Sequence, residues 1–194
     1  MNIYSTIKKK FTIFILVFTM ILGLVPTLSV QAATTDFKII SKTEVTAAQA
    51  KKWAQSKGAT DTFADLAKLY WKYAEECGGV NPGIAYVQAA KETGYGRFGG
   101  VLDESYNNPC GMKTSSGGGD YDKEAHQRFN SWDEGVQAHM DHLALYAGAD
   151  GYPKANTYDP RHFVTIKGRA TTTNSLGGNG LQVQLMVKKL VNFI

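Results

Sequence analysis

Cysteine is scarce in this sequence, which has Cys77 and Cys110 among 194 residues. Two cysteines without a matching set of histidines do not make a structural zinc site. A disulfide between them would stabilise the fold by roughly 3 kcal/mol. Cys110 could equally be a small buried hydrophobe. The separation of the two cysteines in the sequence does not show whether their Cα atoms lie close enough for a disulfide, so both alternatives stay open.

An excess of one charge is also lacking once the N-terminus is set apart. The whole chain carries a formal net charge of +4. Three of its lysines, Lys8 to Lys10, belong to the N-terminal segment, and without them the net charge is +1. Proteins that bind nucleic acid usually present a marked basic excess. The sequence therefore predicts no nucleic-acid partner.

Long apolar runs are confined to the N-terminus. Lys8 to Lys10 precede an apolar run from Phe11 to Val25, which Pro26 ends, and small residues stand near Ala32. This is the three-part pattern of a secretory signal, and its apolar run is short for a membrane span. We expect a signal peptide over residues 1–32, export to the cell wall or medium, and no membrane attachment after cleavage. An uncleaved anchor is the alternative.

No repeat, Pro-rich linker or charge block divides residues 36–194, so we expect a single domain there. Helix-start patterns are frequent in it. Thr46 with Gln49 is a capping box, Asn81-Pro82 is a cap followed by proline at the first helical position, and Ser131 opens a third helix. Apolar residues also repeat at helical spacing over 63–77, and a last apolar segment covers 181–194.

Strand patterns are weak by comparison. The best candidate is Glu124 to Phe129, which follows the glycine-rich loop Gly117 to Gly119 and could form one arm of a hairpin. The sequence thus predicts an α+β fold that is mainly α, with one small β-hairpin.

Glu92 is the carboxylate with the most suggestive position, in the last turn of a helix whose other face is apolar. A glycosidase needs a carboxylic acid that is still protonated near neutral pH. The helix dipole and aromatic neighbours such as Tyr95 would disfavour the charged form, whereas Arg97 would favour it. Taken alone, a glutamate at a helix end is more often a solvated surface residue.

Several segments in order resemble one family. They are Asn81-Pro82, Gln88-Ala-Ala-Lys-Glu-Thr-Gly-Tyr-Gly96, Asn107-Asn-Pro-Cys-Gly-Met-Lys113, Phe129-Asn-Ser-Trp-Asp-Glu-Gly135 and Tyr158-Asp-Pro160. Together they resemble the glucosaminidases of glycoside hydrolase family 73, which degrade peptidoglycan. No single motif is decisive, but their order and spacing cover nearly the whole region after the signal peptide.

The resemblance implies a lysozyme-like fold in which the hairpin flanks a cleft and Glu92 is the general acid. It implies an endo-β-N-acetylglucosaminidase that acts on peptidoglycan glycan strands. Family members often carry a second carboxylate about thirty residues further on, and Glu124, Asp122 and Asp120 stand there, with Glu124 as first choice. The substrate's own N-acetyl group could instead act as nucleophile.

Aromatic rings stack on the apolar faces of sugars, and amides bind their hydroxyl groups. The candidates for substrate binding are Tyr95, Tyr106, Asn108, Tyr121 and Tyr158. Each tyrosine has a structural alternative, because such rings commonly pack in a core or at its rim. His139 and His142 lack the four-residue spacing and adjacent glutamate of a metalloprotease motif, so we expect structural or surface histidines, no metal and no cofactor.

Two other functions remain as alternatives. A lysozyme-like fold also supports a muramidase or a lytic transglycosylase, which cut the other bond of the repeat. A non-catalytic wall-binding module that kept the cleft is a different class. In each case the expected partner is the glycan strand, and we expect a monomer.

The terminal segment departs from the family pattern, which commonly continues Leu-Gly-Gly with Lys-Trp-Ala-Pro-Ser-x-x-Tyr-Gly. Here residues 179–187 read Asn-Gly-Leu-Gln-Val-Gln-Leu-Met-Val. With suitable codons, the same nucleotides read one position earlier encode Lys-Trp-Ala-Pro-Ser-Thr-Thr-Tyr-Gly. We therefore hypothesise a compensated frameshift over 179–187, either in the gene or in its sequencing. Resequencing decides between a shifted and an unshifted frame.

Overall fold

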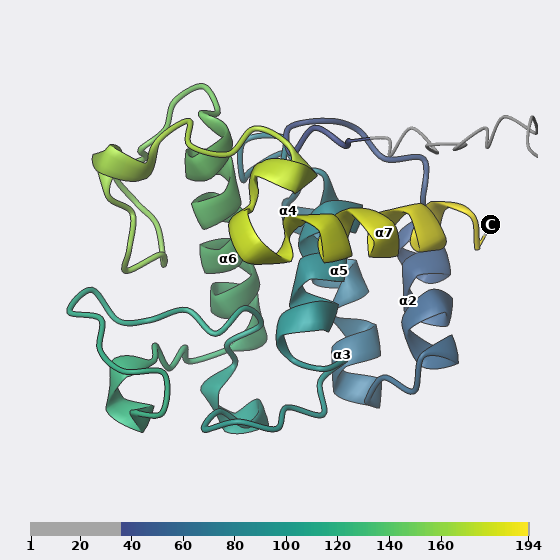
Figure 1. The fold of residues 1–194 in the computed structure, drawn as a ribbon, viewed down its shortest axis with the longest axis horizontal. Coiled ribbons are helices and arrows are strands. Elements are labelled where there is room, and N and C mark those ends of the chain that lie inside the picture. Colours follow the sequence, from purple (N-terminus) through teal and green to yellow (C-terminus); the bar gives the residue numbers. More distant parts are fainter. Residues whose placement is uncertain (1–35, 194) are drawn as a thin grey trace, which may run out of the picture. The chain divides into compact units, whose positions relative to one another are not determined.

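The structure, a computed structural model, describes residues 36–193 (Figure 1). The expected signal peptide, residues 1–32, lies outside them. The α-helices are α2 (Ala47–Ser56), α3 (Asp61–Asp65), α4 (Ala67–Tyr73), α5 (Pro82–Glu92), α6 (Trp132–Ala147) and α7 (Gly180–Val191). Short 3₁₀ turns connect them: η1 (Glu104–Tyr106), η2 (Lys123–Ala125), η3 (Val164–Ile166), η4 (Thr173–Ser175) and η5 (Gly177–Asn179). No helix among the described residues is long and apolar enough to cross a bilayer.

The three helix starts expected from the sequence are confirmed. At α2, the Thr46 hydroxyl accepts from the Gln49 backbone N–H at 3.2 Å. In return, the side-chain oxygen of Gln49, Oε1, accepts from the Thr46 backbone N–H at 2.8 Å. The Asn81 side chain caps α5, and the Ser131 hydroxyl caps α6. These caps satisfy N–H groups that a helix leaves unpaired at its start.

The apolar stretch 63–77 forms two helices rather than one. α3 ends at Asp65 and α4 begins at Ala67, so the helical hydrogen-bond pattern breaks at Leu66. The apolar face is nevertheless as expected, because Phe63, Leu66, Leu69, Tyr70, Tyr73 and Cys77 are all buried.

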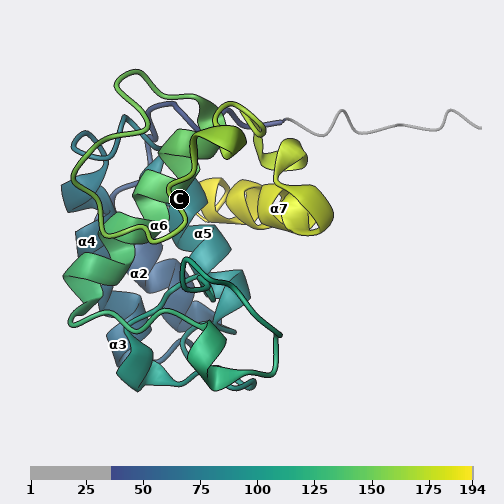
Figure 2. The ribbon, with the colours of Figure 1, turned by 90° about the vertical axis from the view of Figure 1, so that its left-hand side faces the viewer.

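The main hydrophobic core surrounds α5. Its residues Ile84 to Val87, together with Ala89 and Ala90, have no exposed surface. A helix that is apolar on all sides belongs inside a domain. α5 packs against α4, α6 and α7, and Figures 1 and 2 show it between these neighbours. Glu92, the last residue of α5, therefore lies at the end of a helix that is buried along most of its length.

The expected hairpin is not formed as a pair of strands. Within residues 36–193 the only β-pairing consists of isolated bridges, one of them between Lys113 and His126. The Asp122 carboxylate accepts from the Glu124 N–H at 3.0 Å and closes the η2 turn where a strand was expected. Beyond this turn, the Gln127 N–H donates to the Met112 carbonyl at 2.9 Å. The fold is mainly helical with almost no strand, consistent with a lysozyme-like domain.

Both cysteines are free thiols. Cys77 lies in the main core, and Cys110 packs against a small second cluster formed by Met112, Phe129 and Ala138. Burial raises the pKa of both thiols. Of the two alternatives that the sequence leaves open, the structure shows no bridge: Cys77 is a buried hydrophobe, and Cys110 is partly buried.

Candidate active site

A tight turn directly after α5 fixes the position of Glu92. The Thr93 hydroxyl donates to the Ala89 carbonyl at 2.8 Å and accepts from the Gly96 N–H at 2.9 Å. Gly96 has a positive φ of 81°, and a Cβ there would lie 2.4 Å from the Thr60 hydroxyl oxygen. Only glycine fits such a site. The Thr-Gly-Tyr-Gly part of the motif therefore ends the helix at Glu92.

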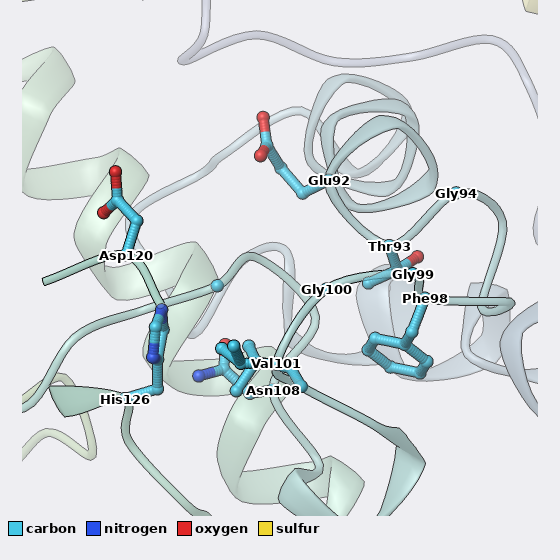
Figure 3. Close-up of a pocket in the computed structure, with 12 residues that line it drawn as sticks. Glu92, Thr93, Gly94, Phe98, Gly99, Gly100, Val101, Asn108, Asp120 and His126 are labelled. Carbon is cyan, nitrogen blue, oxygen red and sulfur yellow. The ribbon is translucent and has the colours of Figure 1, made fainter. Parts of the chain in front are cut away.

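Two pockets meet at Glu92. The first, which we name the Asp120 pocket, has a volume of about 310 Å³, and Figure 3 shows Glu92, Thr93, Phe98, Asn108, Asp120 and His126 around it. The second, which we name the Arg161 pocket, has a volume of about 340 Å³. The residues that line it include Gln88, Lys113, His139, Tyr146 and Arg161. Glu92 lines both, so it lies where the two pockets adjoin.

The contacts of Glu92 all involve one oxygen. The Asn179 amide donates to Glu92 Oε1 at 3.1 Å, and the Lys91 ammonium lies 3.9 Å from the same atom. Glu92 Oε2 has no hydrogen-bond partner among the described residues. Arg97, the cation that the sequence placed near Glu92, instead donates to the carbonyls of Lys57 and Gly58. The Glu92 side chain is 28% exposed, so one carboxyl oxygen is available to a ligand.

The three candidates for a second carboxylate occupy different places. Asp120 lines the same pocket as Glu92 and reaches it from the loop between Lys113 and η2 (Figure 3). Lys113 holds it through an ion pair of 3.1 Å. Glu124 and Asp122 line neither pocket, and the Asp122 carboxylate is engaged in the η2 turn. Their catalytic roles stay predictions, and the structure brings only Asp120 of the three beside Glu92.

Residues 67–176, more than half of the chain, match the family described as glucosaminidase, mannosyl-glycoprotein endo-beta-N-acetylglucosaminidase. The chain belongs to the glucosaminidase family. Family membership supports a glycoside hydrolase and implies a glycan substrate. The match ends just before the segment for which a frameshift is hypothesised.

A relative of this glucosaminidase-family chain is an uncharacterized protein of Borreliella burgdorferi. The two are 34% identical over 112 residues, which cover 58% of this chain and 52% of the relative. The chain thus spans about half the length of this curated relative. No solved structure matches the chain.

None of the four tyrosines expected to bind sugar in this glucosaminidase domain lines either pocket. Tyr95 is half-buried against the main core, and Tyr106 is only 6% exposed. Tyr121 and Tyr158 are 93% and 50% exposed. Their binding roles stay predictions. Sequence reasoning missed Tyr146, an aromatic residue of α6 that lines the Arg161 pocket.

Asn108 lines the Asp120 pocket, but its amide is engaged with the backbone. Its nitrogen donates to the carbonyls of Met112 and Gln127, both at 2.9 Å. Its oxygen accepts from the N–H groups of Met112 at 2.9 Å and Cys110 at 3.3 Å. The expected contact with a sugar hydroxyl stays a prediction. The observed role is to hold the loop 108–112 at the floor of the pocket.

Replacing Asn108 by alanine should lower the free energy of unfolding by about 2 kcal/mol, because buried backbone groups lose their partners. Urea unfolding measures this. Asn130→Ala is a suitable control, since the Asn130 amide is exposed and bonds only to Glu134. A loss no larger than that of the control would contradict the supporting role.

His139 is a buried residue of α6 with a polar partner at each ring nitrogen. It is 2% exposed, Tyr70 Oη lies 2.9 Å from its Nδ1, and Gln88 Oε1 lies 3.2 Å from its Nε2. Burial, with a smaller contribution from His142, lowers the pKa of His139 to about 3. A neutral ring that accepts from Tyr70 and donates to Gln88 satisfies both nitrogens. No group of three or more potential metal ligands occurs among the described residues.

This buried histidine predicts an acid-sensitive fold. Its native pKa of about 3 lies below the ordinary 6.5, so the unfolded chain binds the additional proton between these values. The associated stability is present above about pH 6.5 and is lost as pH falls, by at most about 1.4 kcal/mol per pH unit. Urea unfolding of wild type and His139→Gln between about pH 7 and pH 5 should show a shallower pH slope in the variant. Equal slopes would contradict this, with His126→Gln as control.

Proposed function

We propose that this chain is an exported peptidoglycan hydrolase, an endo-β-N-acetylglucosaminidase in which Glu92 is the general acid. The observation that supports this proposal most strongly is the position of Glu92 at the junction of two pockets, with one carboxyl oxygen that has no hydrogen-bond partner among residues 36–193. A polymer that occupies both pockets would place one glycosidic bond over Glu92. Proton transfer to the oxygen of that bond would assist its cleavage.

Asp120 is the second carboxylate that the geometry supports best. It shares a pocket with Glu92 and forms an ion pair with Lys113 beside the space a sugar would occupy. In that position it could stabilise the positive charge that develops on the sugar ring, or activate water. The substrate's N-acetyl group is the alternative nucleophile, and it would leave Asp120 with a purely electrostatic role.

The proposal that the protein is exported rests on the N-terminal pattern of lysines, apolar run and small residues. Cell fractionation tests it. We expect the chain in the medium or wall fraction, beginning near residue 33, and a chain that keeps residues 1–32 in the membrane fraction would refute the cleavage.

Product analysis tests the reaction. Purified protein is incubated with peptidoglycan sacculi, the released fragments are treated with a reductant that marks reducing ends, and the sugar at each new end is identified by mass spectrometry. N-acetylglucosamine at the new reducing end is the expected result. N-acetylmuramic acid would instead show a muramidase, and anhydromuramic acid would show a lytic transglycosylase. Binding to sacculi without new ends would show a wall-binding module.

A further inference from the structure

The two pockets beside Glu92 differ in charge. Glu92 lines both pockets, and the Asp120 pocket adds the carboxylate of Asp120. The Arg161 pocket contains Lys113 and Arg161, together with apolar groups that include the Tyr146 ring. A glycan lying across Glu92 would therefore meet an acidic site on one side and a site with two cations on the other.

The charge of Lys113 is already compensated. Its ammonium forms the ion pair with Asp120 and also donates to the carbonyls of Gly119 at 2.7 Å and Gly118 at 3.4 Å. An ammonium group has three N–H donors, and these contacts engage all three. Lys113 thus holds the loop that carries Asp120 and has little capacity left for a ligand.

Arg161 is different. Its guanidinium donates to the Thr114 carbonyl at 3.2 Å, and among residues 36–193 no carboxylate lies within ion-pair distance of it. A guanidinium has five N–H donors in a planar fork that matches a carboxylate. Most of this donor capacity remains available at the pocket, and the guanidinium also lies over the Phe163 ring, with its Cζ 5.4 Å from the ring centroid.

The loop that carries Arg161 is firmly placed. The Asp159 carboxylate accepts from the Arg161 backbone N–H at 2.8 Å. Asp159 is only 4% exposed, and its carboxylate lies 2.9 Å from His142 Nδ1 and 3.0 Å from His162 Nδ1. Burial alone would raise the pKa of Asp159, but these hydrogen bonds lower it overall, so the group is a stable anion. The Tyr158-Asp-Pro160 motif therefore fixes the backbone of a pocket-lining cation.

We propose that the Arg161 pocket binds a sugar bearing a carboxylate, and that this contact sets the direction of the glycan strand. The inference rests on the proposed function and names the subsite for the acidic sugar of the repeat. The carboxylate could be that of the lactyl ether or that of an attached peptide stem. The neutral N-acetylglucosamine would then occupy the Asp120 pocket, and the bond over Glu92 would be the one that a glucosaminidase cuts.

Binding measurements on the full chain carrying Glu92→Gln test this without hydrolysis. Titration calorimetry at low salt would compare three soluble ligands: a β-1,4-linked N-acetylglucosamine oligomer, a peptide-free glycan oligomer with free lactyl carboxylates, and the same oligomer with peptide stems. Adding Arg161→Gln should raise the Kd for a carboxylate-bearing ligand about tenfold and change that for the neutral oligomer less than about twofold. Whichever acidic ligand loses affinity identifies the source of the carboxylate.

Two further variants separate charge from loop structure. Arg161→Lys should keep most of the preference for the acidic ligand, because the positive charge remains. Arg169→Gln removes an exposed arginine that does not line the Arg161 pocket and should change no Kd. An equal rise in the Kd for all three ligands would overturn the proposal, and the role of Arg161 would then be its structural contact with the Thr114 carbonyl. Unchanged affinities would overturn it as well.

Failure of the subsite proposal and failure of the proposed hydrolase activity give different results. Wild-type protein that releases no reducing ends from sacculi would refute the hydrolase, whatever the binding data show. Active protein whose affinities do not depend on Arg161 would refute only the subsite.

Discussion

Replacing Glu92 by glutamine should lower kcat on peptidoglycan by about 10²- to 10⁴-fold, the range that a positioned general acid contributes. Glutamine has nearly the same shape, and its amide oxygen can still accept from Asn179, so the contact at Oε1 persists. What it lacks is a transferable proton for the leaving oxygen. The measurements are clearing of sacculi and release of reducing ends, with thermal unfolding to verify the fold.

Two other substitutions make this test specific. Glu76→Gln removes an exposed carboxylate that lines neither pocket and should leave the rate unchanged. Asp120→Asn should reduce the rate more than Glu124→Gln, because only Asp120 shares a pocket with Glu92. A folded Glu92→Gln protein that retains more than about a tenth of the wild-type rate would contradict the role assigned to Glu92.

Replacing Gly135 by alanine should destabilise the fold by about 3 kcal/mol or more, as a severe overpacking. Alanine normally stabilises a helix by about 1 kcal/mol relative to glycine. Here a Cβ would lie 1.9 Å from the Asn107 carbonyl oxygen and 3.2 Å from the Phe129 ring. The backbone must therefore separate α6 from the loop that leads into the pocket floor at Asn108.

Urea unfolding of Gly135→Ala measures this effect. Gly178→Ala is the matched control, since a Cβ there meets no atom within 4 Å and should change stability little. The Gly135 variant should also lose activity, because Asn107 directly precedes Asn108. Stability equal to that of the control would show that the contact between α6 and the loop is not tight.

The parts of the fold that local interactions determine were predictable. The caps at Thr46, Asn81 and Ser131 each involve residues within three positions, so their sequence pattern suffices. The break at Leu66 and the η2 turn in place of a strand were not predictable. The apolar spacing continues unchanged across Leu66, so it does not mark the break, and the Asp122 side chain caps a turn at the start of the segment expected to be a strand.

The site was predictable to a similar degree. Glu92 could be selected from its motif, and the structure places it where two pockets adjoin. The approach of Asp120 could not, because it depends on a loop held by Lys113. The contact of Asn179 with Glu92 likewise joins residues 87 positions apart. No spacing rule in a single sequence reports such a contact.

The terminal segment has structural importance beyond its uncertain reading frame. As written, it forms most of α7, which buries Val183 and Val187 against the core. Its first residue, Asn179, bonds Glu92, and in the shifted frame that residue would be lysine. The identity of residue 179 therefore changes the contact at Glu92 from a neutral amide to a cation.

The position of Cys110 offers a chemical reporter for cleft occupancy. Its thiol lines the Arg161 pocket and is partly accessible, whereas Cys77 is fully buried. An alkylating reagent should therefore label one cysteine, slowly, because few thiolates form when burial raises the pKa of Cys110. A glycan seated in that pocket would shield the sulfur. Mass spectrometry of the alkylated chain would thus footprint ligand binding with no engineered probe.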